Sequence, residues 1–180
     1  MTHPAVGLLE ITGIARGMVV ADAMVKRAAV ELQRSHPIDP GKYLIVFSGA
    51  VAEVEEAMEA GVEVAGDMLL DHLLLPNAHE AVLPAINGHG YAGEMTSVGV
   101  VECHTLAGAV LGLDAALKAA LVSVIELRLG SGLAGKGYFV LTGDLHDLEA
   151  GTEAAIEVAG TGAVVEIIAS PHQDFLNKAL

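Results

Sequence analysis

Hydrophobic and polar positions along the chain predict a strand–helix unit of mixed α/β class. Residues 6–12 are almost wholly apolar, which is typical of a buried strand, and from Gly17 onward apolar residues recur every four positions, as on one face of a helix. Residues 30–34 are predicted to form a second strand, and the apolar run at residues 43–48 predicts a third. A longer helix follows Gly49, and a short strand and a short helix complete a β-α-β-β-α-β-α unit.

The same unit occurs twice because the sequence itself is duplicated. The segment "VGLLEITGIA" from Val6 recurs as "VGVVECHTLA" from Val98, and "GKYLIVFSGAVAEVEEAMEAGVEVAG" from Gly41 recurs as "GKGYFVLTGDLHDLEAGTEAAIEVAG" from Gly135. The final "NAHEAVLPAI" of the first copy matches "SPHQDFLNKA" of the second. Order is kept throughout, which indicates a tandem repeat. We predict a first domain at residues 1–86, a Gly-rich linker at 87–97 and a second domain at 98–180.

Composition narrows the class of protein. The 180 residues carry a formal net charge of −14, which disfavours nucleic acid as a partner because phosphates attract Lys and Arg. The single cysteine cannot form an internal disulfide, and we see neither a signal-peptide pattern nor an apolar run long enough for a membrane span. Hydrophobic residues make up 53% and aromatic residues only 3%, which indicates a core of small aliphatic side chains. We therefore expect a soluble cytosolic protein with extensive subunit interfaces.

The stretch "RLGSGLAGKGYFVLTG", residues 128–143, contains both G-x-G-x-x-G and most of a phosphate loop. A phosphate loop needs a helix N-terminus directly after the glycines, whose free N–H groups bind the anion. Here a strand is expected on both sides, and Gly137 stands where Ser or Thr would hold magnesium. We interpret the stretch as a β–β loop in which glycine allows positive φ and close backbone approach.

Two longer segments carry a family resemblance. "GLLEITGIARGMVVADAMVKRA" and "LRLGSGLAGKGYFVLTGD" resemble the first strand with its edge helix, and the pore loop with its following strand, of bacterial microcompartment shell proteins. The chain resembles the tandem-domain BMC-T class over essentially its whole length, and within that class the PduT type. The resemblance implies two domains, each with a four-stranded antiparallel sheet flanked by helices. It also implies a homotrimer that forms a pseudohexameric tile with a central pore. The implied role is structural and not enzymatic.

The resemblance also implies which residues have these roles. The loops that converge on the pore match two short segments of this chain. The tile edge matches a lysine in each copy, four residues after an aspartate, although such an i,i+4 pair also stabilises a helix by itself. The expected pore-lining residues are His36, Pro37, Ile38, Asp39, Pro40, Gly130, Ser131 and Gly132, and the expected edge residues are Asp22, Lys26, Asp114 and Lys118.

One position departs from the PduT type, in which a pore cysteine from each of three chains holds an iron–sulfur cluster. Asp39 occupies that position here, and a carboxylate is a poor substitute for thiolate. The only cysteine, Cys103, lies in a predicted strand, so we expect no cluster and no other cofactor. Two roles remain open for Asp39: an anionic constriction, formed with nearby His36, that disfavours anions or attracts a cation, or ordinary turn chemistry.

Other candidates are weaker. His79 and His172 match across the copies just before the last helix of each, which favours capping or packing over metal binding. No Ser-His-Asp set can be assembled. The alternative function is a ferredoxin-like regulator that binds a small molecule at the Gly-rich loop. For a shell protein, the expected partners are other shell proteins at the tile edges, with the encapsulated enzymes as further candidates, and the expected location is the microcompartment.

Overall fold

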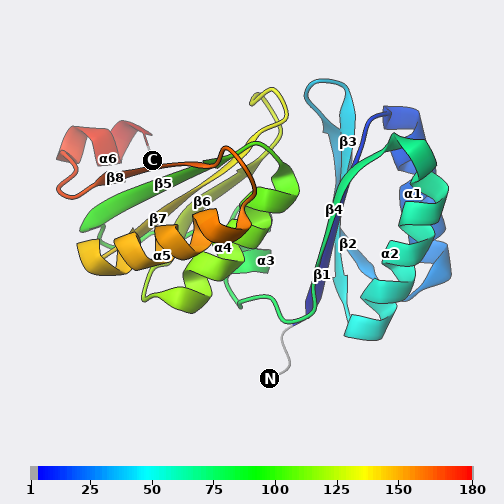
Figure 1. Ribbon diagram of the computed structural model, residues 1–180, viewed down its shortest axis with the longest axis horizontal. Helices are drawn as coiled ribbons and strands as arrows, with labels where there is room; N and C mark the ends of the chain where they lie inside the picture. Colours follow the sequence, from blue (N-terminus) through cyan, green and yellow to red (C-terminus); the bar gives the residue numbers. More distant parts are fainter. Residues whose placement is uncertain (1–3, 180) are drawn as a thin grey trace. The chain divides into compact units, whose positions relative to one another are not determined.

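The computed structural model describes residues 4–179 and contains two successive sets of strands and helices (Figure 1). The chain separates into two compact units. The first runs to Ala78 and also includes the segment Gly130–Gly135, and the second comprises His79–Leu129 and the chain from Lys136 onward. The first copy contains β1 (Ala5–Ile11), α1 (Ile14–Arg27), β2 (Glu31–Ile38), β3 (Lys42–Gly49), α2 (Val51–Ala65), the 3-10 turn η1 (Gly66–Met68), β4 (Leu69–Leu75) and α3 (Val82–Ile86).

The first unit is built on a four-stranded antiparallel sheet in the order β2-β3-β1-β4. Helices α1 and α2 cover the same face of this sheet (Figure 1). Its core is mainly aliphatic, as the composition predicted, with Phe47 as the largest fully buried side chain beside residues such as Leu9, Met24 and Val54. Glycines permit close packing in this core, because a Cβ at Gly7 would lie 2.2 Å from the Phe47 ring.

The second copy repeats the plan. It contains β5 (Ser97–Cys103), α4 (Leu106–Ala119), β6 (Ser123–Leu129), β7 (Gly137–Gly143), α5 (Leu145–Val158), β8 (Val164–Ile168) and α6 (Gln173–Ala179). The strand order is β6-β7-β5-β8, again antiparallel, so each strand holds the place of its counterpart in the first sheet. The predicted fold of two repeated four-stranded sheets with flanking helices is therefore confirmed.

Several predicted boundaries were wrong. Strand β2 extends to Ile38 and not only to residue 34, because β2 lies at the edge of its sheet, where the missing N–H of Pro37 breaks no essential hydrogen bond. Helix α1 begins at Ile14 and not at Gly17. Its N-cap residue is Gly13, which has no side chain to cap the helix, so the sequence carried no capping signal for the earlier start.

The short helix α3 belongs to the second unit, which begins at His79, although the duplication assigns this helix to the first copy. It packs against α4 and β6. The predicted linker, residues 87–97, also contacts β6, where the Tyr91 N–H donates to the Val124 carbonyl at 2.7 Å. No helix within residues 4–179 is long and apolar enough to cross a membrane.

Candidate functional site

The turn between β2 and β3 is tighter than predicted. His36, Pro37 and Ile38 were expected in a loop, but they form the end of β2, and only residues 39–41 make the turn. Gly41 has a φ of 86°, and its N–H donates to the Ile38 carbonyl at 3.1 Å. Ile38 is buried. Asp39 and Pro40 are exposed at the tip of this turn.

The Gly-rich segment between β6 and β7 is a turn, as predicted, and no helix follows it. Gly130, Gly132 and Gly135 all have positive φ, between 74° and 85°, which side chains disfavour. Gly130 also provides close contact, because a Cβ there would lie 2.9 Å from Cδ1 of Ile38. The phosphate-loop motif is thus explained by backbone geometry alone.

The first unit brings these two turns together, because the segment Gly130–Gly135 belongs to it. The backbone N–H of Gly132 donates to Oδ2 of Asp39 at 2.5 Å. Ser131 and Gly132 are exposed, like Asp39. Asp39, Pro40, Ser131 and Gly132 therefore form one small exposed surface, whereas Gly130 is buried.

His36 lies in β2, two residues before the end of the strand at Ile38, and its side chain is only partly exposed. Burial, and next the positive charge of Arg34, lower the pKa of His36 below its usual value. The imidazole is therefore mostly neutral at pH 7. His36 adds a polar side chain near the turn but little charge.

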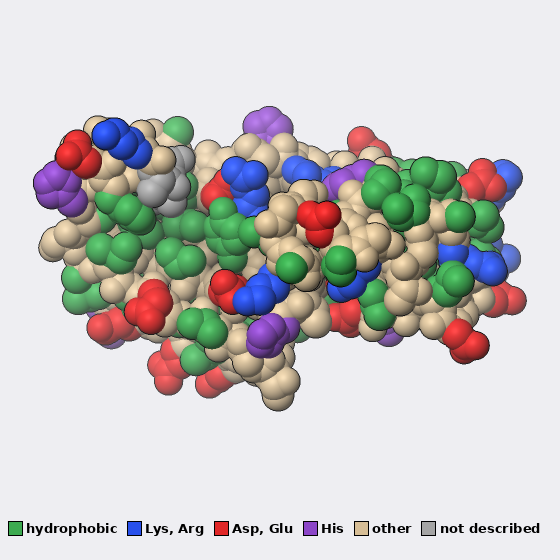
Figure 2. Space-filling view, turned by 90° about the horizontal axis from the view of Figure 1, so that it is seen from above, with side chains coloured by type: hydrophobic (Ala, Val, Ile, Leu, Met, Phe, Trp, Pro, Cys, Tyr) green, Lys and Arg blue, Asp and Glu red, His purple; other side chains and the backbone are tan. Residues whose placement is uncertain are grey.

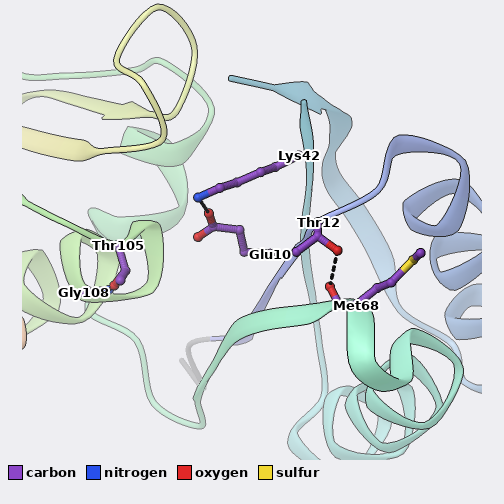
Figure 3. A network of polar contacts seen from close by, with 6 residues as sticks. All are labelled: Glu10, Thr12, Lys42, Met68, Thr105 and Gly108. Atoms are coloured by element: carbon purple, nitrogen blue, oxygen red, sulfur yellow. Dashed lines mark hydrogen bonds and ion pairs between the residues drawn. The ribbon is translucent and has the colours of Figure 1, made fainter. Parts of the chain in front are cut away.

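An ion pair in each sheet was missed by the sequence reasoning. Lys42 Nζ donates to Oε1 of Glu10 at 2.5 Å, directly after the Asp39 turn, and the Glu10 side chain is almost fully buried (Figure 3). In the second sheet, Lys136 Nζ donates to Oε1 of Glu102 at 2.6 Å, and both side chains are more exposed. The signal was available, because a Gly-Lys pair and a central-strand glutamate recur in both copies.

The predicted edge pairs both form but lie in different environments. Lys26 Nζ lies 2.5 Å from Oδ2 of Asp22, and both side chains are exposed. Lys118 Nζ lies 2.6 Å from Oδ2 of Asp114, which is buried. The difference arises at Asp114, whose second oxygen, Oδ1, accepts the backbone N–H of His79 at 2.7 Å.

The described residues do not fit an iron–sulfur cluster. Cys103, the only cysteine of the sequence, is fully buried in β5, and burial, followed by the charge of Glu102, raises the pKa of its thiol to about 11. A cluster needs accessible thiolates, whereas the exposed turn offers the Asp39 carboxylate. Residues 4–179 also contain no group of three or more His, Cys, Asp or Glu side chains arranged to hold a metal ion.

The two matched histidines make the same local contact, as the capping hypothesis predicted. Nδ1 of His79 accepts the N–H of Ala81 at 3.2 Å, and Nδ1 of His172 accepts the N–H of Asp174 at 3.1 Å. Each histidine thus fixes the turn that leads into the short last helix of its copy.

Comparison with known proteins matches both copies to one domain type. The BMC domain model matches residues 5–78 and 97–172. The chain is 40% identical over 172 residues to the bacterial microcompartment shell protein PduT of Citrobacter freundii, covering 94% of each chain. It is 36% identical over 80 residues to the carboxysome shell protein CcmK2 of Synechococcus elongatus, which covers 42% of this chain and 78% of that protein. The fold is similar to the crystal structure of a microcompartment protein from Desulfitobacterium hafniense, with a TM-score of 0.88, 35% identity, and coverage of 97% and 98% of the two chains.

Proposed function

The chain belongs to the BMC-domain family of bacterial microcompartment shell proteins, and on that premise we propose that three copies close into one pseudohexameric tile of the shell. The family resemblance predicted from the sequence is confirmed, and so are the shell-protein role and the location in a microcompartment. The family assignment favours this role over the small-molecule regulator. Two similar domains in one chain let three chains supply six wedge-shaped units, and contacts that are head-to-tail and closed produce a ring.

The contact between the two turns is the observation that carries the proposal. Asp39 and Gly132 lie within hydrogen-bonding distance, at matching β–β turns of the two copies. If three such pairs meet around a threefold axis, Asp39 turns alternate with Ser131 turns around a central opening. Small residues at positions 130–132 let several backbones approach the axis closely.

Asp39 gives this opening its charge. Three carboxylates around one axis would disfavour the passage of small anions and would attract a cation. The hydrogen bond from Gly132 uses one carboxylate oxygen of Asp39 and leaves the other for solvent or an ion. Turn chemistry and an anionic opening are therefore compatible roles of the same side chain. We propose that the opening contains no iron–sulfur cluster and that the protein has no enzymatic activity.

The exposed Lys26 is proposed to contact neighbouring tiles, and Lys118 is proposed to do so at the matching edge. The neighbours would be other shell proteins, and one face of the tile would meet the encapsulated enzymes. Because the exposed Lys26–Asp22 pair is worth only about 0.3–0.5 kcal/mol to its helix, replacing Lys26 should leave the fold intact. Replacing Lys118 costs more, because its partner Asp114 is buried, so circular dichroism has to show that this variant is folded.

Native mass spectrometry and electron microscopy test the proposal together. Purified protein should have the mass of a trimer, and concentrated protein should form flat sheets with hexagonal order. Lys26→Ala combined with Lys118→Ala should keep the trimer and lose the sheets, whereas Arg27→Ala, also exposed on α1, should keep both. A monomer in the mass spectrum would contradict the tile. Sheets that survive the double lysine variant would contradict the edge role.

A further inference from the structure

The short helix α3 shows how the last segment of a copy docks on a BMC-type sheet and helix. Its apolar residues Val82, Ala85 and Ile86 are buried within the second unit. The preceding His79 N–H donates to Oδ1 of Asp114, while Oδ2 of the same carboxylate pairs with Lys118. One aspartate on α4 therefore anchors both the edge lysine and the incoming segment.

The groove around this segment is lined by α4 and β6. Its lining includes His79 and Pro84 of the segment together with Leu117 of α4 and Val124 of β6. The segment that enters it comes from the first copy, so the second copy receives a helix that the duplication does not assign to it.

The segment at residues 170–179 repeats the docked one but has no equivalent site in the second unit. It shares the histidine turn, because His172 Nδ1 accepts the Asp174 N–H as His79 Nδ1 accepts the Ala81 N–H. Phe175 stands at the position of Val82. Yet α6 makes no extensive contact with another element among the described residues (Figure 1). The Phe175 side chain is only partly buried.

The matching receptor surface on the first copy is uncovered. The Asp22 side chain is 59% exposed, whereas that of its counterpart Asp114 is 6% exposed. Val25 is 42% exposed against 6% for its counterpart Leu117. Leu32 is 37% exposed against 5% for its counterpart Val124. The three matched positions thus differ in the same direction. On the face of the molecule drawn in Figure 2, apolar side chains lie among charged ones.

We propose that the segment 170–179 of one chain docks on α1 and β2 of a second copy of this chain. Asp22 Oδ1 accepts the backbone N–H of His172 there, and Phe175 covers Val25 and Leu32. Oδ2 of Asp22 keeps its pair with Lys26, as Oδ2 of Asp114 keeps Lys118. The contact is head-to-tail, and such contacts give a ring when the rotation between chains closes, so the contact rests on the proposed trimer. It makes the receptor site on each first copy incomplete without the neighbouring chain.

Site-directed crosslinking tests this contact in the full chain. In a Cys103→Ala background, Val25→Cys and His172→Cys are combined and treated with a short bismaleimide. The matched control combines Leu117→Cys with His79→Cys, two positions that line the occupied groove. Native mass spectrometry of both proteins is recorded first. The control should crosslink within one chain and stay at monomer mass in denaturing gels, and the test pair should give covalent dimers and trimers.

The outcomes separate the two proposals. A trimer whose test pair does not crosslink, or crosslinks only within one chain, would overturn the docking contact and leave the tile intact. A protein that is monomeric in native mass spectrometry would overturn both.

A second measurement does not depend on introduced cysteines. Phe175→Ala should raise the dissociation constant of the trimer by about tenfold or more, because a buried aromatic anchor commonly dominates an interface. Val164→Ala, which alters an exposed apolar residue of β8, should leave that constant unchanged. Circular dichroism should show both variants folded. An unchanged dissociation constant for Phe175→Ala would count against the contact.

Discussion

Gly17 is the position at which a single methyl group should most clearly destabilise the first copy. A Cβ at Gly17 would lie 2.3 Å from Cγ of Tyr43 and 2.4 Å from Cβ of Tyr43. The ring cannot rotate away at no cost, because the Tyr43 hydroxyl is hydrogen-bonded to Oγ of Ser35 at 3.0 Å. Rotation would also leave the Cβ–Cβ overlap unchanged. Gly17→Ala must therefore displace α1 from β3.

The expected magnitude combines two opposing effects. Overpacking a core costs about 1–3 kcal/mol, and here the clash involves a side-chain atom next to the backbone, which favours the upper end. Replacing glycine by alanine inside a helix stabilises the helix by about 1 kcal/mol. We expect Gly17→Ala to lower the free energy of unfolding by about 2 kcal/mol, measured by urea denaturation at fixed protein concentration with circular dichroism detection.

The duplication supplies the controls. The second copy has Ala109 and Gly137 at the positions of Gly17 and Tyr43, so alanine on the helix is paired with glycine on the strand. In a Tyr43→Gly background, Gly17→Ala should therefore be neutral or stabilising, while in a Tyr43→Ala background it should keep part of its cost.

A buried glycine at which an added Cβ would make only ordinary van der Waals contacts serves as the second control. Gly151→Ala in α5, where the nearest atom would be 3.5 Å away, should be neutral or stabilising by up to about 1 kcal/mol. If Gly17→Ala proves as stable as the unmodified protein, or if the two Tyr43 backgrounds behave alike, the steric argument is wrong.

Three further predictions concern charged and reactive groups. Lys42→Met should lower the free energy of unfolding by about 2–4 kcal/mol, because it leaves the buried Glu10 carboxylate unpaired. Lys136→Met, at the more exposed pair, should lower it by at most about 1 kcal/mol. Equal losses for the two variants in urea denaturation would contradict this prediction. The Cys103 thiol should resist maleimide at pH 8 in the folded protein and react on unfolding. Because folding raises the pKa of this thiol to about 11, its contribution to the free energy of unfolding is full below pH 9 and is lost as the pH rises toward 11. Cys103→Ala should remove this loss from the pH dependence of unfolding. Asp39→Cys, treated anaerobically with iron and sulfide, should acquire the visible absorption of an iron–sulfur cluster, and the unmodified protein should not; a cluster in the unmodified protein would refute the fit argument.

The duplicated pattern made most of the fold predictable. Repeats are visible in a single sequence, so the order of strands and helices in one copy checked the other. The Gly-rich stretch was interpreted correctly because strand patterns on both sides left no room for a helix N-terminus. Pro37 led to a predicted end of β2 that was too early, since a proline marks a turn in most contexts but is tolerated in an edge strand.

The site was less predictable because it depends on partners in space. The position of Asp39 beside Gly132 and the different burial of Asp22 and Asp114 arise from tertiary contacts that no spacing rule encodes. The Glu10–Lys42 pair was missed because the two residues are far apart in sequence, although their recurrence in both copies was visible.

The glycine–tyrosine fit of the first copy has a consequence for how the gene can evolve. Tandem copies invite unequal recombination, which would exchange α1 for α4 between the halves. Such an exchange would place Ala109 against Tyr43 in one product, which would create a steric clash. In the other product Gly17 would face Gly137, which would leave unfilled space between helix and strand. Each half therefore accepts only its own helix, and a recombination product that exchanges the helix without its strand should be destabilised.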